Sequence, residues 1–178
     1  MEKKTFTLIE QYAKSLVEVA LEKGSLAVIQ SETESLISVY ETTNLNNFLS
    51  SPAVSHDERV KLVKLLQESS SEYMSNFLEV ILQNEREVYL YQILIAVLEE
   101  ISVATNEYDV LITTAIPLSE EQRERILSFV QGKFGIVAGR LIEKNDESIL
   151  GGFIISVNNT IIDTSIRSQL QQLKMNLK

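Results

Sequence analysis

Residues 1–105 carry apolar side chains at helical spacing almost throughout, and they contain one glycine and one proline. Apolar residues that recur every three or four positions form one face of an α-helix. The pattern predicts a first helix that Gly24 ends, a second helix from about 25 to 41, and a short helix or loop over 44–51. With the helices that follow Pro52, this half is predicted to be a compact bundle of five or six helices.

Local signals mark where the later helices of this half begin. Ser55 and Glu58 form the S-x-x-E pattern of a capping box, in which each side chain satisfies a free backbone amide of the other. A serine run over 69–71 opens the next helix. The last helix, from about 88 to 105, is apolar nearly all round, which is typical of the central helix of a bundle.

The spacing changes at Asn106. From Val110 to Ile116 the residues alternate in the two-residue period of a β-strand, which Pro117 ends. A second capping box begins at Ser119 and opens a helix that runs to residue 134, with Gly135 as its C-cap. Two further strands are predicted, at about 136–143 and 149–157.

The end of the chain has clear turn chemistry. Two asparagines, Asn158 and Asn159, tolerate positive φ and predict a turn, which a short apolar pair follows. Asp163 stands where a helix N-cap is expected, before a final helix over 164–178. The predicted fold is therefore mainly α with two domains: a helical bundle over 1–105, and a small α+β domain of order β-α-β-β-α over 106–178.

Composition excludes several kinds of chemistry. The chain has no cysteine and one histidine, so disulfides, thiolate metal sites and histidine-based metal sites are ruled out. The net charge of −9 argues against nucleic acid as a partner. Residues 1–105 hold 8 basic and 16 acidic residues, a net of −8, whereas residues 106–178 hold 8 and 9, a net of −1. This difference in net charge between the two halves suggests two domains with different partners.

The expected location follows from what the apolar segments lack. The first residues show no signal-peptide pattern, and the most apolar segment, 88–98, is about half the length of a membrane span. We therefore expect a soluble, cytoplasmic protein that reaches a membrane only through partners.

No arrangement of residues typical of an enzyme is present. His56 is the only group that titrates near neutral pH, and its position in a capping box favours a structural role. The pair Gly151–Gly152 lacks the fingerprint of a phosphate loop and precedes a strand, so it indicates a bulge or close packing. Neither a catalytic residue nor a cofactor is predicted.

Three helical segments have features beyond simple core packing. The first helix has an apolar arc of about half its circumference, and the helix containing residues 74–82 has more large apolar surface than a short bundle helix needs. Core packing explains part of both, and an open groove is the alternative. The tail helix carries Arg167, Lys174 and Lys178 with no acid, which suits either a solvated helix end or a partner surface.

Taken together, the ordered features resemble one known family. They are residues 12–14 (Tyr-Ala-Lys), 76–78 (Asn-Phe-Leu), 84–86 (Asn-Glu-Arg), and the run 146–163 with its glycine pair and asparagine turn. The chain resembles the delta subunit of the rotary ATP synthase, called the oligomycin-sensitivity-conferring protein in mitochondria. One difference is that asparagines and the run 163–165 (Asp-Thr-Ser) stand where the family often has glycine.

The resemblance implies a non-catalytic stator subunit. The N-terminal six-helix bundle would sit on the catalytic head, with a groove between its first and fifth helices for the amphipathic N-terminal helix of an alpha subunit. The C-terminal domain would hold the b-subunit peripheral stalk, and the protein would lie at the cytoplasmic face of the membrane. The groove residues implied are Ile9, Tyr12, Ala13, Leu16, Met74, Phe77, Leu78 and Ile81, and the stalk residues are Arg167, Leu170, Leu173 and Lys174. The alternative is a stand-alone adaptor that binds some other helix.

Overall fold

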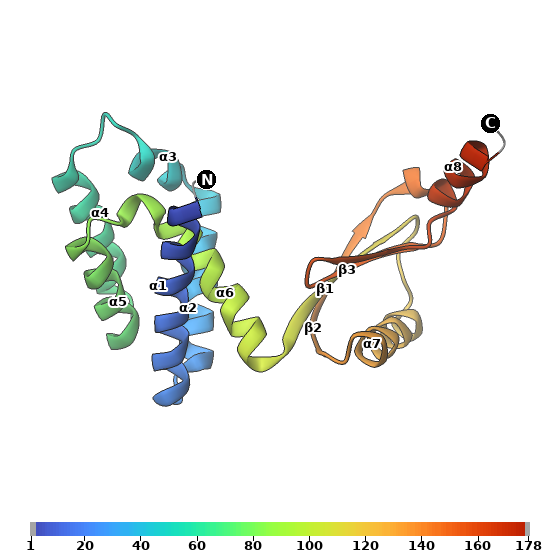
Figure 1. Cartoon of the computed structure of the whole chain (residues 1–178), viewed down its shortest axis with the longest axis horizontal. Helices are drawn as coiled ribbons and strands as arrows, with labels where there is room; N and C mark the ends of the chain where they lie inside the picture. The colour runs from blue at the N-terminus through green and yellow to red at the C-terminus, as the bar shows by residue number, and fades with distance from the viewer. Residues whose placement is uncertain (1–2, 177–178) are drawn as a thin grey trace. The chain divides into compact units, whose positions relative to one another are not determined.

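The computed structural model describes residues 3–176 and divides the chain into two compact units, 1–104 and 105–178 (Figure 1). The first unit is entirely helical in the described part of the chain. Its elements are α1 (Lys3–Glu22), α2 (Leu26–Thr42), α3 (Leu45–Ser50), α4 (His56–Glu68), α5 (Glu72–Gln83), the 3₁₀ turn η1 (Glu87–Tyr89) and α6 (Leu90–Thr105). The predicted mainly helical first half is confirmed.

Short-range signals fix the helix ends in this unit. The predicted capping box is present at the start of α4, where the Ser55 hydroxyl accepts from the Glu58 amide and the Glu58 carboxylate accepts from the Ser55 amide. Ser71 caps α5 by accepting from the Met74 amide. The carboxylate of Glu32 on α2 also accepts hydrogen bonds from the Ser71 amide and hydroxyl, which ties two helices together.

The core of the first unit gathers around α6. Its residues Leu90, Ile93, Leu94 and Val97 have no exposed surface. The continuous helical run Glu87–Thr105 is the one part of the described chain that is long and apolar enough to cross a membrane. That run is longer than the segment 88–98 considered from the sequence, but its side chains form the centre of the bundle, so we interpret it as a core helix.

The second unit is a four-stranded mixed sheet with helices. Its elements are β1 (Glu107–Thr114), α7 (Glu120–Phe134), β2 (Val137–Asn145), the 3₁₀ turn η2 (Glu147–Ile149), β3 (Phe153–Val157), β4 (Thr160–Asp163) and α8 (Ile166–Asn176). The strand order is β2-β1-β3-β4. Strand β1 is parallel to β2 and antiparallel to β3, and β3 and β4 form an antiparallel hairpin. Figure 1 shows α7 against the sheet.

Two details at the end of the chain differ from the sequence prediction. The apolar pair after the asparagine turn belongs to a fourth strand, β4, because Asn158 and Asn159 both have positive φ and return the chain along β3. Asp163 ends that strand and is not the N-cap of α8. The N-cap is Ser165, whose hydroxyl accepts from the Ser168 amide. The Asp163 carboxylate, two residues before this N-cap, accepts a hydrogen bond from the Ser165 amide.

The glycine pair is explained by close packing. A Cβ on Gly152 would lie 2.4 Å from the carbonyl oxygen of Thr164, and its φ of +73° disfavours other residues. A Cβ on Gly151 would lie 2.8 Å from a methyl carbon of Ile166. The chain entering β3 therefore passes directly against the start of α8. The interpretation that the pair marks close packing, rather than a phosphate loop, fits this geometry.

Candidate partner-binding surfaces

A groove opens on the first unit between α1 and α5. Its volume is about 330 Å³. One wall comes from α1 and the other from α5, and nearly all the surface is apolar: Tyr12, Ser15, Leu16 and Val19 face Tyr73, Asn76, Phe77 and Val80. The rings of Tyr12 and Phe77 meet edge to face, with centroids 6.4 Å apart, and join the two helices along the groove floor.

The groove residues expected from the sequence divide into two sets. Tyr12, Leu16 and Phe77 line the groove. The other five are at most 4% exposed and lie in the bundle core, where they do not line it: Ile9, Ala13, Met74, Leu78 and Ile81. Apolar spacing marks the centre of a buried face, and the centre of that face points into the core.

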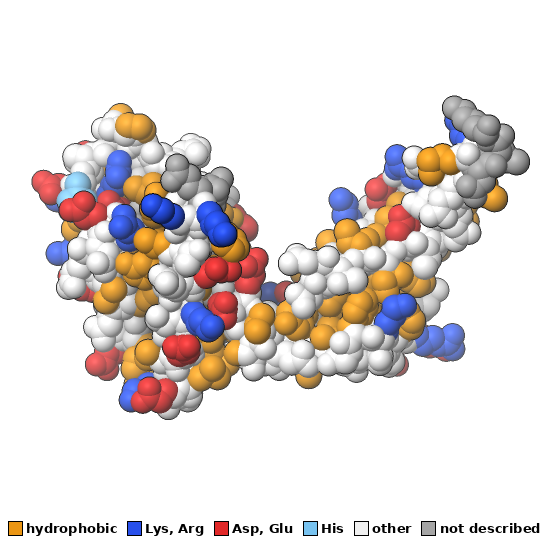
Figure 2. Space-filling model, in the orientation of Figure 1, with side chains coloured by type: hydrophobic (Ala, Val, Ile, Leu, Met, Phe, Trp, Pro, Cys, Tyr) orange, Lys and Arg blue, Asp and Glu red, His pale blue; other side chains and the backbone are white. Residues whose placement is uncertain are grey.

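The exposed apolar side chains of the groove lie at the edges of the buried faces of α1 and α5. Val19 is 42% exposed, Tyr73 is 36% exposed and Val80 is 45% exposed. Sequence reasoning missed these three residues. Their signal was weak but present, because each is a large apolar residue just outside the buried arc of an already amphipathic helix. Figure 2 shows hydrophobic side chains among charged ones at the surface of this unit.

A second surface is the final helix, α8. None of its side chains is buried in the part that the structure describes. Ile166, Leu170 and Leu173 are 44%, 53% and 58% exposed, and their spacing of four and three places them on one face. The sequence identified the two leucines and missed Ile166.

The charges of α8 are both basic in its described part. Arg167 donates to the Ser148 hydroxyl over 3.1 Å, so its side chain rests on η2. Lys174 lies in the last turn, where a cation favours the helix dipole. Lys178, the third cation of the tail, lies outside the described residues. The helix thus presents an apolar stripe beside positive charge.

His56 has a partner that its sequence position did not reveal. Its Nδ1 lies 3.3 Å from Oε1 of Glu87, which is 2% exposed. Arg59 lies 3.7 Å from the same carboxylate oxygen and donates to the Ser51 carbonyl over 2.9 Å. These contacts connect the start of α4 with η1. They support a structural role for His56, and the histidine itself stays half exposed.

No group of three or more His, Asp or Glu residues between 3 and 176 is arranged to hold a metal ion. Neither candidate surface contains a nucleophile beside a base. Both present exposed apolar side chains.

Comparisons with known proteins identify the family of this chain. A family model described as the ATP synthase delta (OSCP) subunit matches residues 8–177. The chain belongs to the ATP synthase delta family. A delta-family relative, the ATP synthase subunit delta of Streptococcus equinus, is 66% identical over all 178 residues and the full length of both chains. The corresponding protein of Streptococcus pyogenes serotype M1 is 58% identical over the same span.

The delta-family fold also recurs in a solved structure. A chain in the structure of the Toxoplasma gondii mitochondrial ATP synthase hexamer aligns with a TM-score of 0.72 at 24% identity, over 96% of this chain and 97% of that one. As a delta-family subunit, the protein is a non-catalytic stator component of an F-type ATP synthase, the complex of ATP synthesis and proton transport. It associates peripherally with the membrane complex of a bacterial enzyme. The stand-alone adaptor is thereby excluded.

Proposed function

We propose that this delta-family subunit ties the catalytic head of the ATP synthase to its peripheral stalk at the cytoplasmic face of the membrane. The groove between α1 and α5 receives the amphipathic N-terminal helix of an alpha subunit, and α8 contacts the b-subunit stalk. The subunit resists the torque of the rotor and takes no part in ATP or proton chemistry. It meets the membrane only through the complex and does not bind nucleic acid.

The observation that carries the head contact is the groove itself. It has apolar walls on two antiparallel helices, with Ser15 and Asn76 as polar positions among them. Helix-in-groove recognition uses such a surface, with apolar anchors spaced about one turn apart on the incoming helix. Burial of about 500 Å² of apolar surface would gain roughly 12 kcal/mol gross. Lost translational freedom and side-chain ordering offset much of this gain, and a tight reversible complex remains.

The stalk contact is supported by the poor packing of α8 within its own unit. An isolated helix of about 11 residues is marginal in water, because most helix stability in proteins comes from packing of an apolar face. The face with Leu170 and Leu173 is more than half exposed. A partner helix that covers this face would bury it and would meet Arg167 and Lys174 with acidic side chains.

Variants that damage one surface at a time test this assignment. In the full-length chain, Val80→Asp should abolish retention of the catalytic head and leave binding to the b-subunit stalk intact. Leu173→Asp should have the opposite effect. Both side chains are about half exposed, so both variants should melt at nearly the wild-type temperature. The assignment fails if either folded variant keeps both partners, or if one variant loses both.

A further inference from the structure

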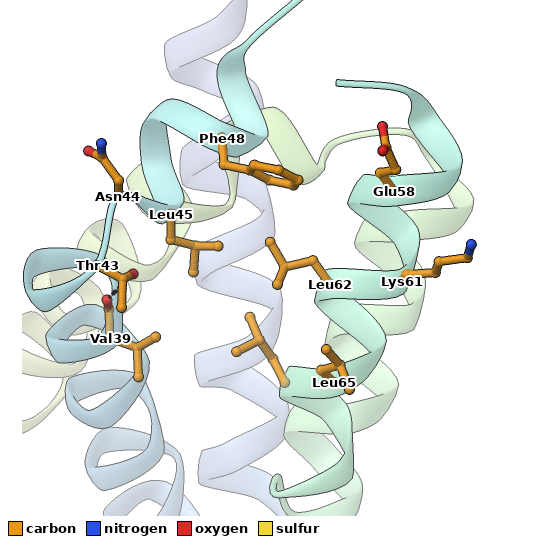
Figure 3. Close-up of a pocket in the computed structure, with 10 residues that line it drawn as sticks. Val39, Thr43, Asn44, Leu45, Phe48, Glu58, Lys61, Leu62 and Leu65 are labelled. Atoms are coloured by element: carbon orange, nitrogen blue, oxygen red, sulfur yellow. Dashed lines mark hydrogen bonds between the residues drawn. The ribbon is translucent and has the colours of Figure 1, made fainter. Parts of the chain in front are cut away.

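The exposed apolar surfaces of the two units differ in how firmly their elements are held. In the first unit, a groove of about 570 Å³ separates α4 from α3 and the end of α2. Figure 3 shows Phe48 and Leu62 pointing across this groove from its two sides. Its walls are tied together, because Arg59 on α4 donates to the carbonyl of Ser51 at the end of α3. The apolar side chains of α8 in the second unit are not held in this way.

Helix α8 is attached to its unit through its first turn. The Ile166 amide donates to the Gly151 carbonyl over 3.1 Å, and Arg167 donates to the Ser148 hydroxyl. Among the described residues, 170–176 form no hydrogen bond or ion pair outside the helix. Figure 1 shows α8 beyond one end of the sheet. The helix is thus held at one end, where two residues join it to β4.

One face of the sheet is uncovered in the same unit. Helix α7 packs on the face that carries Val110, Ile112 and Ile155. Because successive residues of a strand point to opposite faces, a row of side chains crosses the other face over all four strands. The strand register aligns the members of this open-face row, which are Ile142, Leu111, Ser156 and Ile161. Ile142, Leu111 and Ile161 are 47%, 40% and 67% exposed.

The dimensions of α8 match this face. A helix of 11 residues is about 16 Å long, and the five-residue strand β3 is about 17 Å long. Two linking residues suffice for a connection that reverses the chain, and a reversed α8 would run along β3 in the same direction. Leu170 lies about 6 Å beyond Ile166 on the helix. Ser156 lies about 7 Å beyond Ile154 on the strand, so Leu170 would reach the open-face row.

The charges favour the same contact. The described part of α8 carries Arg167 and Lys174 and no acid. Asp109 lies on the open face about 7 Å beyond Leu111, and Lys174 lies about 6 Å beyond Leu170, in the same direction. Asp109 already pairs with Arg140, but a carboxylate can accept from more than one cation. A reversed α8 would therefore place Lys174 beside an acid.

We propose that α8 is a strap, which in the unassembled subunit folds back over the open face of the sheet and packs Leu170 and Leu173 on the open-face row. Closing removes half-exposed apolar side chains from water on both the helix and the sheet. It gives up the exposed bond from Arg167 to Ser148, which water can replace. On the proposed function, α8 contacts the stalk. The closed strap then hides the stalk-binding side chains until the b-subunit stalk displaces it from the sheet.

Engineered disulfides test the strap, because the chain has no cysteine of its own. The full-length subunit, free of other subunits, carries Leu111→Cys with Leu170→Cys, and disulfide formation is followed under mild oxidation by mass spectrometry. The matched control combines Leu170→Cys with Phe129→Cys, since Phe129 is 45% exposed on α7, at the opposite face of the sheet. The pair 111 and 170 should form an intramolecular disulfide at least about tenfold faster than the control pair, because contact raises the effective concentration of the thiols.

Two further arms identify what the strap contacts. Ile161→Asp places a charge in the open-face row and should slow the disulfide between 111 and 170 about tenfold, while Ile161 is exposed enough for the unit to stay folded. A b-subunit stalk segment, added before oxidation, should slow the same disulfide by a similar factor, because it competes with the sheet for α8.

Four results would overturn the proposal: a rate no faster than the control, a disulfide that joins two copies of the chain, a rate unaffected by Ile161→Asp, or a disulfide that forms unchanged while the stalk segment is bound to α8. Failure of the proposed function gives a different result. The stalk segment would then bind the Leu173→Asp variant as well as wild type, whereas the disulfide would still form rapidly in the free subunit.

Discussion

Val80→Asp is the sharpest test of the groove between α1 and α5. Val80 lines this groove from α5 and is 45% exposed, so about half of its surface is available to a partner. Burying a whole valine gains about 1.5–3 kcal/mol, and covering the exposed part gains roughly 1 kcal/mol. An unpaired carboxylate in an apolar contact costs about 2 kcal/mol more. The sum of roughly 3 kcal/mol corresponds to an affinity loss of about 150-fold.

The assay is calorimetric titration of the full-length chain with a peptide of the alpha-subunit N-terminus, alongside thermal melting. Val103→Asp is the matched control, because Val103 is 63% exposed and lies on α6 outside the groove. It should leave both affinity and melting unchanged. Leu78→Asp should instead unfold the bundle, since Leu78 has no exposed surface. Unchanged peptide affinity in a folded Val80→Asp variant would refute the assignment of this groove.

Further predictions concern stability. In urea denaturation, His56→Gln should change the free energy of unfolding by less than about 1 kcal/mol, because the histidine is half exposed. Glu87→Ala should cost about 3 kcal/mol, because it leaves the partly buried guanidinium of Arg59, 17% exposed, without its carboxylate partner. Equal effects of the two substitutions would contradict this account. In thermal melting, Gly152→Ala should destabilise the second unit by at least about 2 kcal/mol, because the added Cβ would lie 2.4 Å from the Thr164 carbonyl oxygen. Gly132→Ala is the control and should be neutral or stabilising, because nothing lies within 4 Å of its added Cβ. Hydrogen bonds, of which the one from the Ser168 hydroxyl has the largest effect, lower the pKa of Asp163. The ionised carboxylate therefore contributes stability above the ordinary aspartate pKa of about 4, and this contribution is lost as pH falls through the lower pKa of the folded state. The free energy of unfolding, measured against pH, should decline less on acidification in Asp163→Asn than in wild type.

The parts of the fold that depend on neighbouring residues could be predicted from the sequence. The capping boxes at Ser55 and Ser119 form as their four-residue patterns indicate, and Gly135 ends α7 in the left-handed conformation. The change from helical to alternating spacing at Asn106 is one residue from the start of the second unit. Each of these signals lies within a few residues of the feature it specifies, so no tertiary information was needed.

The contacts between distant residues could not be predicted in the same way. The pairing of His56 with Glu87 joins positions 31 apart, and nothing local marks a glutamate as buried. The strand character of the pair after Asn159 depends on hydrogen bonds to β3, because four residues are too few to show a period. The side chain of Asp163 is one that commonly caps a helix, but the residue belongs to strand β4, so the N-cap of α8 is Ser165 instead.

The candidate site was predicted at the level of helices and less well at the level of residues. The two helices chosen from their wide apolar faces do form a groove, with Tyr12, Leu16 and Phe77 in its walls. Apolar spacing cannot separate a side chain at the centre of the buried face from one at its margin, so Leu78 and Ile81 were included although they are fully buried. The side chains at the margin stay exposed, and only the packing of neighbouring helices defines where that margin lies.

The central claim is that this subunit holds the head against the torque of the rotor. The most direct test is the number of protons pumped per ATP hydrolysed in membrane vesicles, with the chain carrying both Val80→Asp and Leu173→Asp. The account predicts that ATP hydrolysis continues while proton pumping falls nearly to zero, because a head that is free to turn cannot drive the rotor. Wild-type pumping per ATP in vesicles where the doubly substituted chain has lost both contacts would contradict it.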